Sequence, residues 1–239
     1  MDILTFISDI RLDLRDVAGD ASEVLWTDAE IITYANDARN KLFTKVRNLI
    51  VDAFTNDDVA GTGTGLPVCE FAVTALTQIY ELSPKVIEIK ELSLASQEAP
   101  LTRITLKELS EGLQNWRTLP AGTPMFWCPE LQTQSVVLIP APAANDTVNM
   151  VVSRFPLDTI ALPGPGETAM DMGFREEYHE DLKTWVMYRA CSKKDAETFN
   201  PELAGEYRTA FEIRVREIRE ELTGRSGAIR NSSTGTMVV

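Results

Sequence analysis

Residues 25–32 read LWTDAEII, and near the other end of the chain residues 177–182 read EYHEDL. Each stretch opens a segment in which apolar side chains recur every three or four residues, the spacing of a helix with one buried face. Such helices must pack against a partner, and the two ends of the chain offer each other the required apolar stripes. We therefore expect an α+β fold, in which the N- and C-terminal helices form one helical bundle and the middle of the chain is an insertion.

Two helices are predicted in the N-terminal part of the bundle. Apolar residues repeat at helical spacing over residues 3–17, which predicts the first helix. The second helix has a defined start, because Thr27 and Glu30 match the Ser/Thr-x-x-Glu pattern of a capping box. Trp26, directly before this cap, is placed to pack back onto the first turns. The apolar stripe then predicts a helix over about residues 28–54.

Two further helices are predicted in the C-terminal part of the bundle. One begins near residue 174 and carries the EYHEDL stretch. The other has Asn200 as its cap and Pro201 at its first helical position, and Gly224 is expected to end it. The predicted core of the bundle consists of apolar and aromatic side chains: Trp26, Ile31, Ala35, Leu42, Tyr178, Leu182, Trp185, Tyr207 and Phe211.

The middle of the chain changes from helical to strand periodicity. From about residue 69 to residue 157, apolar and polar residues alternate in short runs between turn residues. A second capping box, at Thr105 and Glu108, places one short helix among the strands. Few connections are long enough for a parallel crossover, so a small antiparallel sheet is expected. The Gly- and Pro-rich residues 158–173 are interpreted as the linker that returns to the bundle.

These patterns predict a discontinuous domain organisation. The helical bundle is expected to comprise residues 1–55 and 174–222, and the β-rich inserted lobe residues 69–157. Residues 223–239 are mostly polar and end in TMVV, and they are expected to form a flexible C-terminal docking tail.

The charge of this tail differs from that of the whole chain. From residue 214 onward there are five arginines and three glutamates, whereas the whole chain carries a net charge of −13. A basic segment with β-prone residues at its end suits docking onto an acidic partner, for instance by adding a strand to a sheet edge. An untethered tail, which is common at chain termini, explains the pattern equally well. The candidate docking residues are Arg225, Arg230, Met237, Val238 and Val239.

The acidity of the chain limits its possible functions. It has 23 Lys and Arg against 36 Asp and Glu. Proteins that hold DNA by its phosphates need a basic surface, so a DNA-gripping function is excluded. Two interpretations of the charge remain: it keeps the protein in solution, or it forms an acidic wall past which DNA slides. The chain has neither an apolar run of membrane-spanning length nor a secretory signal, so we expect no membrane contact and synthesis in the cytoplasm.

No complete catalytic, cofactor or metal-binding motif is found in the sequence. Cys69, Cys128 and Cys191 are far apart and are expected to be free thiols. The single histidine, His179, lacks the partner ligands of a metal site and is interpreted as a surface residue of a helix. We therefore expect a non-enzymatic protein without cofactor or metal. Carboxylate pairs such as Glu177 and Asp181 leave a cell-wall glycosidase as an alternative, because acid pairs carry no sequence motif.

Several stretches of the chain resemble the head-to-tail adaptor (connector) proteins of tailed phages. The first is residues 26–38, which read WTDAEIITYANDA. The second is residues 138–142, LIPAP, which lead to a strand ending in residues 154–156, RFP. The third is residues 177–196, from the EYHEDL stretch to KKDA. The order and spacing of these stretches over about residues 1–222 carry the resemblance.

The resemblance implies a structural virion protein at the head–tail junction. Adaptors of this kind are ring components, commonly dodecameric, that bind beneath the portal, extend the DNA channel and provide the platform for tail attachment. The implied partners are the portal protein, a downstream neck or tail (nozzle) protein, further copies of the chain, and passing double-stranded DNA without sequence-specific binding. Family members often reach the portal with their C-terminal segment, which corresponds here to residues 223–239. A neck or tail-completion protein on the distal side of the adaptor is the alternative.

Overall fold

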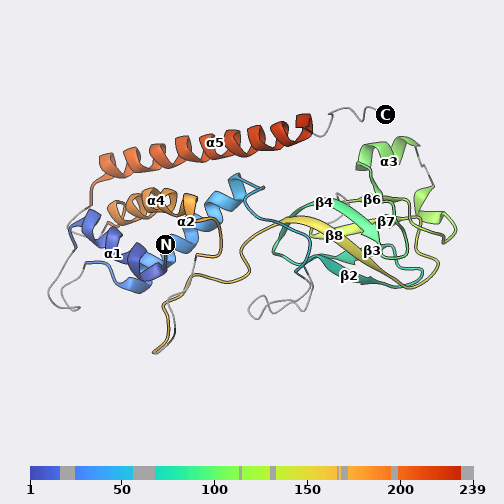
Figure 1. Cartoon of the computed structure of the whole chain (residues 1–239), viewed down its shortest axis with the longest axis horizontal. Coiled ribbons are helices and arrows are strands. Elements are labelled where there is room, and N and C mark those ends of the chain that lie inside the picture. The colour runs from blue at the N-terminus through green and yellow to red at the C-terminus, as the bar shows by residue number, and fades with distance from the viewer. Residues whose placement is uncertain are drawn as a thin grey trace. The chain divides into compact units, whose positions relative to one another are not determined.

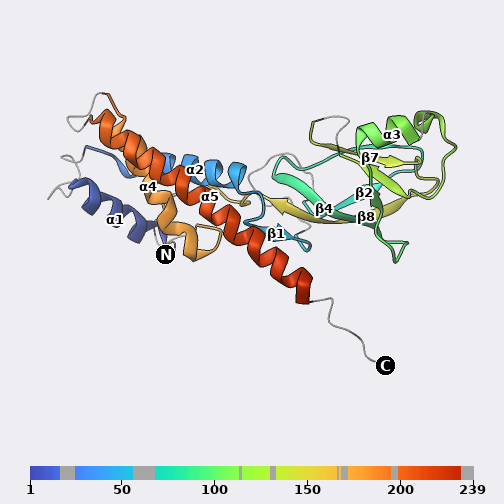
Figure 2. The same cartoon turned by 90° about the horizontal axis from the view of Figure 1, so that it is seen from above.

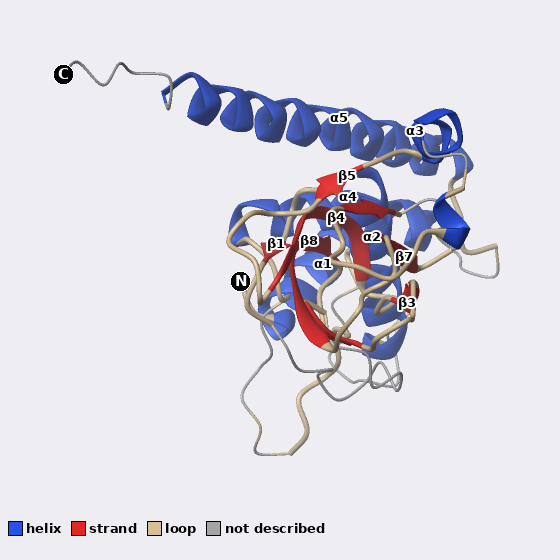
Figure 3. Cartoon of the chain, turned by 90° about the vertical axis from the view of Figure 1, so that its right-hand side faces the viewer, coloured by secondary structure: helices blue, strands red, loops and turns tan. Residues whose placement is uncertain are grey.

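The computed structural model shows an α+β protein, as the sequence predicts (Figure 3), and the chain forms two compact units (Figure 1). The helical unit comprises Met1–Leu49 and Asp158–Val239, and the β unit comprises Ile50–Leu157. Helices from the two ends of the chain pack together in the first unit, and the second is an insertion of two β-sheets. Side chains are described as far as residue 224, and the structure describes residues 1–16, 25–55, 68–112, 115–129, 133–165, 167, 172–194 and 199–232.

The helical unit is organised around one central helix. Its described helices are α1 (Ile3–Leu14), α2 (Asp28–Lys45), the short 3-10 helix η3 (Glu176–Tyr178), α4 (His179–Cys191) and α5 (Pro201–Ser232). α4 contacts α1, α2 and α5, and Figure 2 shows α5 crossing it. With 32 residues, α5 is about 48 Å long at 1.5 Å per residue, so it extends well beyond the 13 residues of α4.

The helix starts follow the sequence signals. At α2, the backbone N–H of Glu30 donates to Thr27 Oγ1 at 3.2 Å, and Thr27 N–H donates to Glu30 Oε2 at 3.0 Å, which confirms the capping box. At α5, Leu203 N–H donates to the side chain of Asn200 at 3.1 Å, which confirms Asn200 as the cap. Each cap satisfies backbone donors that the first helical turn leaves unpaired.

The β unit contains two sheets. In the first, β8 (Asp146–Arg154) pairs antiparallel with β4 (Val86–Leu94) on one side and with β1 (Val51–Asp52) and β2 (Glu70–Val73) on the other. The second has the order β3 (Ile79–Glu81), β7 (Ser135–Ile139), β6 (Phe126–Cys128), β5 (Thr102–Arg103).

One strand pair contradicts the expectation of a wholly antiparallel sheet. β5 and β6 run parallel, with Thr102 opposite Phe126 and Arg103 opposite Trp127. Parallel neighbours need a crossover connection, and here it holds α3 (Leu106–Gly112) and η2 (Trp116–Thr118). The predicted capping box of α3 is confirmed, because Thr105 N–H donates to Glu108 Oε2 at 2.8 Å and Glu108 N–H to Thr105 Oγ1 at 3.2 Å.

Apolar residues of both sheets form one core between them. On β7, Val136 and Leu138 belong to this core, whereas Val137 and Ile139 face the opposite way and pack with Leu109 and Trp116 beneath α3 and η2. β7 is therefore buried on both faces, which explains why its sequence is a continuous apolar run rather than an alternating one.

Three predicted helix ends are wrong. The helix expected over residues 28–54 ends at Lys45, because Val51–Asp52 forms β1 and pairs with Ser153 and Val152 of β8. The helix expected over residues 3–17 ends at Leu14, and Arg15 takes a left-handed conformation with φ 55°. α5 passes through Gly224 and continues to Ser232.

Candidate functional site

α5 is held to the helical unit along only part of its length. Its buried side chains are Ala204, Phe211, Val215 and Ile218, at helical spacing. The Phe211 ring lies 4.9 Å from the Trp185 ring of α4, between ring centroids. Between Ile218 and residue 224 no described side chain is buried. The side chains of residues 219–224 are therefore at least partly open to solvent or to a partner.

The candidate docking residues fall at this end of the chain. Arg225 and Arg230 belong to α5, in the part of which the structure describes the backbone alone. Met237, Val238 and Val239 lie outside the described residues. Of the predicted tail, residues 223–232 are helical, so the expectation that all of it leaves the helix is wrong. Docking by these residues stays a prediction.

The predicted core residues lie where the apolar faces of the helices meet, with one difference. Trp26, Ile31, Ala35, Leu42, Tyr178, Leu182, Trp185 and Phe211 are buried. Tyr207 is half-buried on α5, three residues after the buried Ala204 and four before the buried Phe211. Burial of its hydroxyl raises the pKa of Tyr207, as do the nearby Cys191 and the carboxylates of Asp13 and Glu206.

His179 is not the surface residue that the sequence indicated. Its side chain is buried, with 1% exposure. Nε2 lies 2.8 Å from the carbonyl oxygen of Phe174, which only accepts, so Nε2 is the donor of this hydrogen bond. The ring also packs edge-on against the Phe174 ring, 4.8 Å away. His179 is therefore a structural residue that fixes the start of α4.

The predicted return linker, residues 158–173, is fastened to α2 by a buried arginine. Arg39 donates to the carbonyl oxygens of Met172, at 3.2 Å, and Asp158, at 2.7 Å. Asn36, one turn earlier, exchanges two hydrogen bonds with the backbone of Ile160, at 2.8 and 3.0 Å. Burial lowers the pKa of Arg39 to about 10, which still leaves it charged at neutral pH. The linker is thus part of the helical unit.

A groove lined by cations lies between α2, α4 and α5, and we call it the cationic groove. Trp185 Nε1 donates to Asp37 Oδ2 at 2.9 Å, and Arg189 pairs with the same oxygen at 2.6 Å. Lys41 Nζ lies 5.6 Å from the centre of the Trp185 ring. The lining residues are Asp37, Lys41, Lys45, Trp185, Tyr188, Arg189, Ser192, Arg208 and Glu212. Four cations therefore face two carboxylates, on a chain that is acidic overall.

Two cations of this groove are uncompensated among the described residues. Lys45 forms an ion pair with Glu212, and Arg189 forms one with Asp37. Lys41 and Arg208 are exposed and make no ion pair within the described part of the chain.

The opposite side of α5 carries an excess of carboxylates, and we call it the acidic flank. Arg214 Nε donates to Asp181 at 2.8 Å, and Arg214 Nη1 contacts Glu217 and Glu221 at 3.2 Å each. These hydrogen bonds, the one to Asp181 first, raise the pKa of Arg214, whereas burial raises the pKa of Asp181 despite this partner. The carboxylates of the acidic flank are Asp13, Asp181, Glu206, Glu217 and Glu221.

The sequence interpretation missed the cationic groove, although a signal was present. Its residues sit four apart on three helices: Asp37, Lys41 and Lys45 on α2, Trp185 and Arg189 on α4, and Arg208 and Glu212 on α5. That spacing places each set on one helix face. The sequence could not show that the three faces adjoin.

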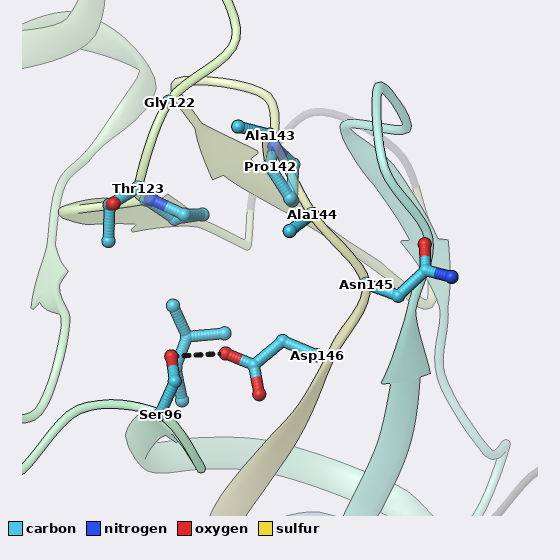
Figure 4. A pocket seen from close by; sticks show the side chains of 10 residues that line it. Ser96, Gly122, Thr123, Pro142, Ala143, Ala144, Asn145 and Asp146 are labelled. Carbon is cyan, nitrogen blue, oxygen red and sulfur yellow. Dashed lines mark hydrogen bonds between the residues drawn. The ribbon is translucent and has the colours of Figure 1, made fainter.

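A small pocket lies at one end of the β unit (Figure 4). Ser96 Oγ donates to Asp146 at 2.5 Å, a hydrogen bond that lowers the pKa of Asp146. Beside it, Asn145 Oδ1 accepts from Ala75 N–H at 2.9 Å. Asp146 is the one ionisable residue of its lining, which otherwise consists of small polar groups and apolar residues such as Pro142 and Ala143. The pocket therefore lacks the paired acids of a glycosidase.

Metal and thiol chemistry have little support in the described residues. Within them, no three His, Cys, Asp or Glu side chains lie together in a way that could hold a metal ion. Cys69, Cys128 and Cys191 are free and buried. Burial raises the pKa of the Cys69 thiol to about 11 and also raises that of Cys191, so neither is activated as a nucleophile.

None of the described helices combines the length and the apolar character that crossing a membrane requires.

Comparisons with known proteins agree with the resemblance seen in the sequence. No curated protein matches the chain. A family model described as SU10 adaptor protein matches residues 1–237, which is nearly all of the chain, including both units and α5. The chain therefore belongs to the SU10 adaptor protein family, a family of structural phage head-to-tail adaptors.

Proposed function

We propose that this chain forms a ring of identical subunits at the head–tail junction of the virion, beneath the portal, and that the genome passes through the ring. The observation that carries the proposal is the family match over residues 1–237. Because the match includes the β unit as well as the helices, it concerns the whole architecture and not one shared motif. In this position the ring extends the DNA channel and offers a platform for the next neck or tail protein.

The charge of the chain supports a passive role toward DNA. A net charge of −13 repels the phosphate backbone, so DNA gains no binding energy from an average surface of the protein. A channel below the portal must let DNA move during ejection, and a surface without phosphate contacts imposes little friction. DNA is therefore a passing partner and not a ligand.

The end of α5 supports contact with the portal. After Ile218 the described side chains are no longer buried in the helical unit, yet the helix continues for fourteen residues to Ser232. A helix that continues past its own core gains little stability from packing, so a partner is a reasonable use for it. We infer that residues 223–239 dock to the portal.

The test is negative-stain imaging of portal particles mixed with the full-length protein. An added ring of density beneath the portal is expected. Density that appears only when a downstream neck or tail protein is also present would instead favour the distal position. Release of sugars from peptidoglycan by the protein alone would contradict a structural function.

Two truncations locate the docking segment. Removal of residues 223–239 should abolish binding to the portal while the helical content of residues 1–222 is retained, as circular dichroism would report. Removal of residues 233–239 alone leaves α5 complete, so comparing the two truncations shows whether the docking contact lies in the end of α5 or in the residues after it. Normal portal binding by the longer truncation would contradict docking through this segment, without affecting the ring proposal.

A further inference from the structure

The two sides of α5 carry opposite charge. With 3.6 residues per turn, Arg208, Glu212 and Arg219 lie on one side of the buried stripe, and Tyr207 and Arg214 lie on the other. The contacts agree with this division. Arg219 Nη2 donates to the carbonyl oxygen of Lys45 at 2.8 Å, on the side of the cationic groove. Arg214 contacts Asp181, on the side of the acidic flank.

The cationic groove offers both charge and aromatic side chains. Lys41 and Arg208 line it, exposed and without an ion pair among the described residues. Trp185 and Tyr188 also line it, with their rings edge to face and 4.9 Å apart between centroids. Trp, Tyr and Arg are enriched at protein–protein contact surfaces. Its own carboxylates, on Asp37 and Glu212, are already used by Arg189 and Lys45.

The acidic flank offers the complementary surface. Arg214 is shared by three carboxylates, so this cluster keeps an excess negative charge. Asp13 of α1 and Glu206 of α5 add to it, and both lie close enough to Tyr207 to raise the pKa of its hydroxyl through their charge. Asp13 and Glu206 are exposed and, within the described ranges, form no ion pair.

We propose that the cationic groove of one subunit receives the acidic flank of the next, so that Lys41 and Arg208 face Asp13 and Glu206 of a second copy. The two surfaces are different parts of the same helical unit. Contacts between unlike surfaces are head-to-tail, and they close into a ring when the rotation between subunits divides a full turn. This inference rests on the proposed ring and names the surfaces through which it closes.

A second copy fits the groove better than DNA does. The groove contains two carboxylates, Asp37 and Glu212, which a phosphate backbone would have to approach. The chain itself supplies a surface of the required sign on the other side of α5. A head-to-tail contact covers both surfaces in every subunit, so Lys41 and Arg208 of each subunit in a closed ring face carboxylates of the next.

Charge reversal tests the pairing, because every residue exchanged is exposed. The groove variant is Lys41→Glu with Arg208→Glu, and the flank variant is Asp13→Lys with Glu206→Lys. Sedimentation velocity of the full-length proteins measures self-association. We expect each variant alone to associate at least tenfold more weakly than the wild type. An equimolar mixture should recover association, because the reversed groove then meets the reversed flank and the two unmodified surfaces meet each other.

A matched control changes the net charge equally in the β unit. The variant Glu98→Lys with Glu111→Lys gives the same charge change as the flank variant, at two exposed positions, and should associate like the wild type. Raising the salt concentration should weaken wild-type association, since exposed charges are screened.

Four results would overturn the inference. The first is a wild type that is monomeric at every concentration. The second is normal association of the reversed variants, and the third is a mixture that associates no better than each variant alone. The fourth is a groove variant that binds DNA more weakly than the wild type while its self-association is unchanged. The imaging test with portal is independent, so an added ring built from groove variants would reject this interface and leave the proposed function intact.

Discussion

The elements within the helical unit and the elements within the β unit are joined by different kinds of interaction. In the helical unit, side-chain ion pairs join one helix to another: Lys183 to Asp9 at 2.8 Å, Lys193 to Glu30 at 2.6 Å, and Arg189 to Asp37 at 2.6 Å. In the β unit, backbone hydrogen bonds join neighbouring strands, and an apolar core joins the two sheets. Helices satisfy their backbone groups internally, so only side chains can specify how they pack.

The interactions that specify how the elements pack are therefore not the ones that contribute most of the free energy of folding. Partly exposed ion pairs contribute about 0–1 kcal/mol each, so those of the helical unit fix its arrangement more than they stabilise it. Stability in both units must come mainly from buried apolar area. Substitutions of four kinds, from the largest expected effect to the smallest, test this view.

Apolar core substitutions should have large effects in both units alike. Phe211→Ala removes a fully buried ring from the contact of α5 with Trp185, and a loss of about 3–5 kcal/mol is expected in the free energy of unfolding. Leu138→Ala, in the core of the β unit, should cost about 2–5 kcal/mol. Chemical denaturation measures the loss, and hydrogen exchange shows which unit loses protection. A loss below about 1 kcal/mol for Phe211→Ala would mean that α5 is not held by its apolar stripe.

Arg39 should be an exception among the charged residues of the helical unit, because it is buried. Arg39→Leu leaves the carbonyl oxygens of Asp158 and Met172 without a donor, and about 2–3 kcal/mol should be lost. Hydrogen exchange should rise in the return linker. Arg189→Ala, which breaks a partly exposed pair, is the control and should cost less than about 1 kcal/mol. Equal losses for the two variants would show that the burial of Arg39 does not make it contribute more to stability than the partly exposed Arg189.

Asp52 should make the stability of the β unit depend on pH. Burial would raise its pKa, but hydrogen bonds from Phe54 N–H, the Thr55 hydroxyl and Arg154 outweigh this and hold the pKa well below its ordinary value of 3.8. The folded state thus favours the charged carboxylate. Its stabilisation is fully present above the unfolded pKa and is lost as the pH falls below it.

The comparison of wild type with Asp52→Asn measures this effect. Between about pH 5 and pH 3, the free energy of unfolding of the wild type should fall by on the order of 1 kcal/mol more than that of the variant. Parallel pH profiles of the two proteins would show that Asp52 does not carry the effect.

The smallest predicted effects come from two equivalent capping boxes, one in each unit. Thr27→Ala at α2 and Thr105→Ala at α3 each remove a side-chain acceptor from a first helical turn, and each should cost about 1 kcal/mol. Thr→Ser at the same positions keeps the acceptor and should cost less. Thermal unfolding measures both pairs. A much larger loss at Thr27 would indicate that Glu30, which also binds Lys193, couples the cap to α4.

Local signals in the sequence predicted the starts of elements well. A cap is decided by residues no more than three positions apart, so Thr27 with Glu30, Thr105 with Glu108, and Asn200 with Pro201 could be identified without the fold. The α+β class and the joining of the two ends followed from apolar periodicity. The resemblance identified the family, which the comparison with family models confirms.

Features decided by distant residues could not be predicted. Residues 46–54 have helical spacing, but the backbone of β8, a hundred residues away, pairs with Val51 and Asp52 and overrides it. His179 was interpreted as a surface residue because the partner ligands of a metal site are missing, whereas its burial depends on Phe174 and the packing of α4. The cationic groove requires three helices to adjoin, and its spacing of four residues on each helix gave no hint of which faces would meet.

The pairing of β1 with the end of β8 has a consequence for how the insertion joins the rest of the chain. Val51 stands opposite Ser153, so the first and last strands of the insertion are neighbours, with backbones about 5 Å apart. Because the insertion begins and ends at neighbouring positions, its length does not set the distance between the segment that enters β1 and the segment that leaves β8. The helices of this chain are therefore compatible with an insertion of a different length.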